Sequence, residues 1–139
     1  MSQTADGSEP QDRHGHGAVG TWRLMIKPPA PFNVFKAIIA FTSDGIVHQT
    51  VANSVESALG VWEPDGENQF RVTLYVLRHN TAAQLEVVLR VRADFTLADH
   101  DTLTATATVD FLNPENEDIN IRPSEHDTVT GSRMAVMAQ

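Results

Sequence analysis

Apolar and polar residues alternate along much of the chain, a pattern typical of strands with one buried and one solvated face. In 85–97 every odd position is apolar, whereas Glu86, Arg90 and Asp94 stand at even positions. Segment 102–111 repeats the pattern, with threonines on its polar face, and 70–78 is a third run of this kind. The connection 98–101 has hairpin length, so 85–97 and 102–111 are predicted to be adjacent antiparallel strands.

Weaker alternation and turn-forming sequences fill the rest of the chain. The further strands predicted are 20–26, 36–42, 46–52, 59–62 and 128–134. The turns predicted between strands include 43–45, 63–68 and 113–116, which are rich in Asp, Asn, Gly and Pro. About eight strands in consecutive hairpins fit a barrel or a sandwich. We predict an all-β, eight-stranded antiparallel up-and-down β-barrel, because closure removes exposed strand edges.

The first 17 residues are polar and lack a periodic apolar pattern. We expect 1–17 to be a disordered tail and 18–139 to be a single barrel domain. His14 and His16 lie in this tail without further ligands at a useful spacing. The tail also lacks the apolar core of a signal peptide, so a cytoplasmic protein is expected.

Composition excludes several classes of function. The 139 residues contain no cysteine, which excludes disulfides and thiolate chemistry. The net charge of −8 disfavours nucleic acid and anionic membranes, and no apolar stretch is long enough to span a bilayer. His79, His100 and His126 lack the short spacing of a metal site, so neither a metal nor a cofactor is expected.

Small residues in the middle of two predicted strands suggest an internal cavity. Ala93, Ala105 and Ala107 lie on apolar faces, where each leaves the space that a larger side chain would take. Phe95 and Phe111 are placed to floor or cover that space. The prediction is a site for a hydrophobic small molecule. The alternative is that bulky residues of opposite strands fill the gaps and the core is solid.

Two short motifs resemble those of the calycin superfamily, which includes lipocalins and fatty-acid-binding proteins. Gly20-Thr21-Trp22 opens the first predicted strand as G-x-W, and Gly131-Ser132-Arg133 lies in the last. The resemblance implies that Arg133 packs over Trp22 and closes one end of the barrel, as a cation–π contact would. The chain lacks a C-terminal helix and a disulfide, so it is most similar to a small, bacterial-type lipocalin-like barrel. Its size and strand content also resemble allene-oxide-cyclase-like barrels, which implies a cyclase as one function.

Few polar residues are candidates for chemistry inside the barrel. His48 would be a general acid or base if it faces inward, but the pleat turns either His48 or its neighbour Gln49 inward, and the sequence leaves both options open. Tyr75 lies opposite the apolar face of its strand, where a place at the pocket rim would suit its hydroxyl. Trp62 would stack on a ligand at the barrel mouth or pack in the core.

Two functions therefore stay open. The first is a cofactor-free isomerase, cyclase or lyase whose cavity would hold the substrate in a reactive conformation. The second is a carrier or sequestering protein for an apolar metabolite. Motifs for phosphate binding, serine hydrolysis and zinc proteolysis are absent. Val88, on the polar face of its strand, leaves a homodimer open.

Overall fold

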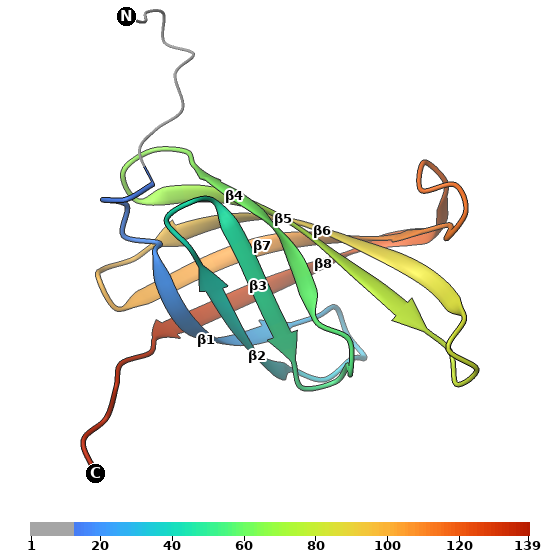
Figure 1. The fold of residues 1–139 in the computed structure, drawn as a ribbon, viewed down its shortest axis with the longest axis horizontal. Coiled ribbons are helices and arrows are strands. Elements are labelled where there is room, and N and C mark those ends of the chain that lie inside the picture. Colours follow the sequence, from blue (N-terminus) through green and yellow to red (C-terminus); the bar gives the residue numbers. More distant parts are fainter. Residues whose placement is uncertain (1–12) are drawn as a thin grey trace, which may run out of the picture.

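The computed structural model describes residues 13–139, which form one closed barrel of eight strands (Figure 1). Each strand pairs antiparallel with the next one, and the last returns to pair with the first. The strands are β1 (Gly20–Lys27), β2 (Phe35–Phe41), β3 (Ile46–Val51), β4 (Ala58–Pro64), β5 (Gln69–His79), β6 (Leu85–Leu97), β7 (Thr102–Leu112) and β8 (Asn120–Arg133). The predicted eight-stranded, up-and-down all-β barrel is confirmed.

The period-two pattern determines which residues form the core. In β7, Leu103, Ala105 and Ala107 are buried, and the threonines between them are exposed. In β1, Trp22, Leu24 and Ile26 are buried in the same way. Since side chains alternate between the two faces of a strand, these residues line the barrel interior.

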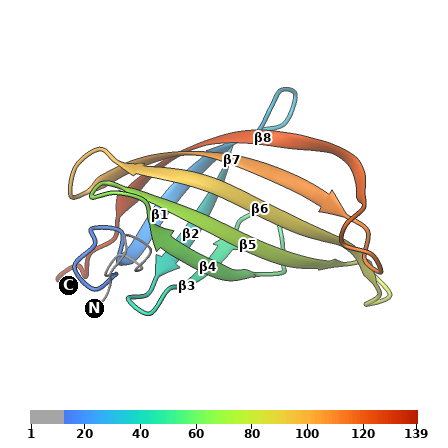
Figure 2. The same cartoon turned by 90° about the horizontal axis from the view of Figure 1, so that it is seen from above.

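The strands differ in length, which makes the two ends of the barrel different. β2 and β3 have 7 and 6 residues, whereas β6 and β8 have 13 and 14. Figure 2 shows the hairpins β5–β6 and β7–β8 reaching past the ends of β1–β4. We call the end with these hairpins the mouth and the opposite end the base.

Aromatic side chains fill the base. Phe41, Trp62, Phe70 and Phe95 are all buried, and the ring centroids of five of their six pairs lie between 5.0 and 5.9 Å apart. The Trp62 indole N–H donates to the carbonyl of Thr42 at 2.8 Å. Aromatic rings at these distances are in edge-to-face or stacked contact, so the base is solid.

The structure brings Trp22 and Arg133 together at the base. They are register partners of β1 and β8, and the guanidinium carbon lies 4.2 Å from the indole centroid. The same guanidinium donates to the carbonyls of Gly17, Val19 and His100 at 2.5, 3.0 and 2.8 Å. Arg133 therefore links residues 17–19 and the β6–β7 turn to the last strand.

Removing this guanidinium should destabilise the barrel. We expect Arg133→Ala to lower the free energy of unfolding by about 2 kcal/mol, because three carbonyls lose a charged donor and an indole loses its cation. Arg133→Lys should recover only part of that loss, since an ammonium cannot reproduce the planar fork. Urea unfolding of the three proteins measures both effects. An unchanged midpoint for Arg133→Ala would contradict the role of this side chain.

Residues 13–17, which the sequence analysis assigned to a disordered tail, contact the barrel base. Arg13 donates to the carbonyl of Trp62 at 3.0 Å. The His16 ring lies 5.7 Å from both Trp62 and Phe70, and its Nε2–H donates to the carbonyl of Gly66 at 3.0 Å. These contacts cover the base from outside. The rest of the predicted tail, 1–12, lies outside the described residues.

A charged network lies on the outer face of the sheet near the mouth. Asp110 is 2% exposed, and its Oδ2 accepts hydrogen bonds from Nε of Arg90 and Arg92 at 3.0 and 3.1 Å, with Nη2 of the two arginines 2.9 and 3.0 Å away. Ser124 Oγ donates to the same carboxylate at 2.5 Å. Burial alone would raise the pKa of Asp110, but the hydrogen bonds and the two arginines outweigh it, so the pKa is lowered. Asp110 is therefore ionised and fully compensated.

Val88 lies in the same region and is 0% exposed. The sequence placed it on an open barrel wall, where it could have contributed to a dimer interface. The predicted exposure of Val88 is wrong, because the side chain is covered within the chain, and the homodimer stays a prediction.

Candidate functional site

A cavity of about 460 Å³ occupies the mouth half of the barrel. Ligand pockets for drug-sized molecules typically measure 300–1,000 Å³, so this one has the volume of a binding site. Most of its wall is apolar, and all eight strands contribute to it. The apolar strand residues that line it are Leu24, Ile26, Phe35, Val51, Ala58, Leu74, Val76, Leu89, Val91, Ala93, Phe95, Ala107, Val109, Phe111 and Val129.

Paired alanines leave the deep part of this space open. Ala93 of β6 and Ala107 of β7 lie directly opposite each other in the sheet, and both line the cavity. Phe95 lies next to Ala93 on the same face and separates the cavity from the aromatic base. Phe111 lines it nearer the mouth.

Two residues predicted to bind a ligand do not line the cavity. Ala105 pairs with Phe95, one inward position closer to the base than Ala107, and is enclosed in the core. Trp62 is 1% exposed and is part of the aromatic base. Both face inward but lie at the solid end of the barrel, outside the cavity wall, and for Trp62 this is the core packing that the sequence left open.

The pleat of β3 separates His48 from Gln49. Val47 is buried, Gln49 lines the cavity, and His48 is exposed on the outer face. Tyr75 is also on the outer face, 37% exposed and opposite Arg90. Neither of the two predicted catalytic side chains therefore reaches the cavity, whereas Gln49 does.

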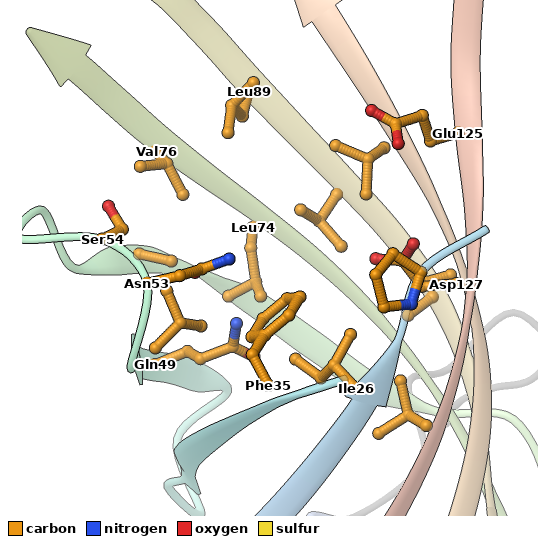
Figure 3. Close-up of a pocket in the computed structure, with 18 of the residues that line it drawn as sticks. Ile26, Phe35, Gln49, Asn53, Ser54, Leu74, Val76, Leu89, Glu125 and Asp127 are labelled. Carbon is orange, nitrogen blue, oxygen red and sulfur yellow. The ribbon is translucent and has the colours of Figure 1, made fainter. Parts of the chain in front are cut away.

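The cavity wall contains a carboxylate that the sequence analysis missed. Asp127 of β8 is half-buried, faces inward beside Ala107, and lines the cavity (Figure 3). Within residues 13–139 its carboxylate has neither a hydrogen bond nor an ion pair. Burial, and then the charge of Glu125, raise the pKa of Asp127. A carboxyl group without a partner in a cavity marks a functional-site candidate.

The other two carboxylates of the wall, Glu125 and Glu56, each have a donor in the protein. Nη2 of Arg122 donates to Glu125 at 3.1 Å, and its guanidinium carbon lies 3.5 Å from the centroid of the Phe111 ring. Glu56 accepts the backbone N–H of His79 at 2.7 Å, and this bond is the main reason that the pKa of Glu56 is lowered, with a smaller contribution from the charge of Arg78. Both carboxylates are thus compensated by the protein.

Apolar side chains surround the entrance. Phe32 and Val34, in the β1–β2 connection, are 61% and 47% exposed and also line the cavity. Asn33, Asn53 and Ser54 supply polar atoms at the same entrance. An apolar molecule would therefore meet apolar surface before it enters.

Other kinds of site find no support in the part of the chain that the structure describes. No group of three or more His, Asp or Glu side chains in 13–139 is placed to hold a metal ion. No helix in this part could cross a membrane.

The fold and the cavity define the class of protein: an eight-stranded antiparallel barrel with an internal pocket at its mouth and an aromatic cluster at its base. No protein-family model and no curated protein matches the sequence. Among solved structures, the chain is similar to EF1p2_mFAP2b bound to DFHBI, with a TM-score of 0.60 and 11% identity over 88% of this chain and 98% of that one. At this identity the similarity establishes the fold alone.

Proposed function

We propose that the protein binds an apolar small molecule in the cavity at the barrel mouth. The observation that carries the proposal is a cavity of about 460 Å³ whose strand wall is mostly apolar. Because cores of natural proteins are close-packed, an unfilled space of this size is a cost that ligand binding would offset. The Trp22–Arg133 contact and the solid base also fit the calycin resemblance, whose members carry hydrophobic ligands.

The similar barrel EF1p2_mFAP2b, solved with the small molecule DFHBI bound, supports the proposal by analogy. The polar strand residues that line the cavity are few, and Gln49 and Asp127 are two of them. Apolar contacts would therefore supply most of the affinity, and these two side chains would orient the ligand.

Native mass spectrometry of the protein purified from its own host is the direct test. We expect an additional mass that organic solvent releases. Ligands from an apolar panel should raise the melting temperature, since a ligand at 100 times its Kd stabilises the folded state by about 2.7 kcal/mol. A protein that carries no ligand and whose melting temperature no panel member shifts would contradict the proposal.

Cofactor-free isomerisation or cyclisation is a second candidate function, and Asp127 is the observation that favours it. A carboxyl group with a raised pKa at an apolar wall is the kind of group that exchanges protons with a bound substrate. The co-purified ligand should then be converted by the native protein and bound unchanged by Asp127→Asn. Recovery of unchanged ligand from the native protein would favour a carrier.

A further inference from the structure

We infer that the cavity selects amphiphilic amines, that is, molecules with a protonated amino group on an apolar body. The inference rests on the proposed binding function and names its ligand class. Three carboxylates and two arginines line the cavity: Glu56, Glu125 and Asp127 against Arg78 and Arg122. The charged side chains of the wall therefore carry one more negative than positive charge.

The pairing within the wall identifies the unbalanced group. Arg122 is held by Glu125 on one side and by the Phe111 ring on the other. Glu56 is satisfied by the His79 backbone N–H and the Ser54 hydroxyl, with Arg78 near it. Only Asp127, among these carboxylates, has no donor in the described residues.

The position of Asp127 suits the head of a ligand whose tail enters the barrel. Its register partner on β7 is Ala107, which in turn faces Ala93. The next inward residue of β8 toward the base is Val129, which is buried. A cation at the Asp127 carboxylate would thus have the space of the paired alanines beside it, with Phe95 at the end of that space.

Other head groups fit this wall less well. An anionic head would approach two carboxylates, Asp127 and Glu125, and burial together with the charge of Glu125 already raises the pKa of Asp127. The guanidinium of Arg122 is already paired with Glu125. A wholly apolar ligand would leave the carboxylate without a partner and remove it further from water. An ammonium supplies both the charge and the donors that Asp127 lacks, and the net charge of −8 attracts cations to the protein.

Three ligands with one chain and different heads test the inference: decylamine, decan-1-ol and decanoate, each below its micelle concentration. Isothermal titration at pH 7 should show decylamine binding about tenfold more tightly than decanol, the gain of one charge-assisted hydrogen bond. Decanoate should bind most weakly. In Asp127→Asn the preference for the amine should disappear while decanol affinity is retained.

Two further variants make the result specific. Asp94→Asn changes the net charge equally, but its carboxylate is on the outer face and 78% exposed, so the amine preference should persist. Asp127→Lys should reverse the preference toward decanoate. An amine preference that survives in Asp127→Asn, or equal binding of the three ligands, would overturn the inference and leave apolar binding intact. Failure of all three to bind would overturn both.

Discussion

Asp110→Ala is expected to lower the free energy of unfolding by about 2–4 kcal/mol, which is among the largest effects available from a single side chain here. The substitution removes a carboxylate that is 2% exposed and leaves Arg90 and Arg92 side by side without a counter-ion. Breaking a buried ion pair costs about 3–5 kcal/mol, and we take a lower range because the arginine side chains are 33% and 54% exposed.

Acid should weaken the same network. The pKa of Asp110 is lower in the folded chain than its ordinary value of 3.8, so between those two values the unfolded state binds more protons. The contribution of Asp110 is therefore complete above its unfolded pKa and is lost as pH falls through the folded pKa. Denaturant unfolding at pH 7 and at pH 3 measures this, and Asp110→Asn should be less sensitive to acid than the parent.

Asp94 provides the matched control for Asp110. It is an aspartate on the same outer face, 3.6 Å from Arg71, and its side chain is 78% exposed. Because exposed ion pairs contribute little, Asp94→Ala should leave the unfolding midpoint unchanged. If Asp110→Ala were equally harmless, the network would have no structural role.

The sequence predicts the face on which a residue lies much better than its depth along the barrel axis. Ala105 and Ala107 share one face of β7, and the period of two identified both as inward. Only Ala107 lines the cavity, because strand register places Ala105 opposite Phe95 at the base. Trp62 was misplaced for the same reason: it faces inward on β4, but at the level of the aromatic cluster.

Asp127 was missed because the start of β8 has no apolar alternation. The prediction began this strand at 128, whereas it begins at Asn120. The segment 120–126 contains Pro123, and the pairing with β7 shifts register near Phe111, so local sequence gives no strand signal. Extending the alternation back from Val129 would have placed Asp127 and Glu125 on the inner face.

The orientation of β3, by contrast, could have been predicted from its sequence. Val47, Gln49 and Val51 alternate with His48 and Thr50, so the two valines indicate that Gln49 faces inward. The burial of Asp110 could not have been predicted from the sequence, because the residues that enclose it come from separate strands with irregular pairing.

Ala107→Leu should lower the affinity for the ligand at least tenfold, while the barrel stays folded. The added side chain would enter the space that Ala107 shares with its partner Ala93, and it would occupy volume that the ligand needs. Because filling a natural cavity adds apolar contacts, the melting temperature should hold or rise. Ala93→Leu should act in the same way from the opposite strand.

Ala105→Leu is the matched control for this prediction, because it makes the same chemical change one inward position closer to the base. Ala105 is 7% exposed and enclosed in the core, so a leucine there should overpack it and cost about 1–3 kcal/mol. Its ligand affinity should stay near that of the parent. Thermal unfolding and titration of both variants with the same ligand separate the two sites. Equal destabilisation of Ala105→Leu and Ala107→Leu, without a difference in binding, would mean that the space beside Ala107 is not available to a ligand.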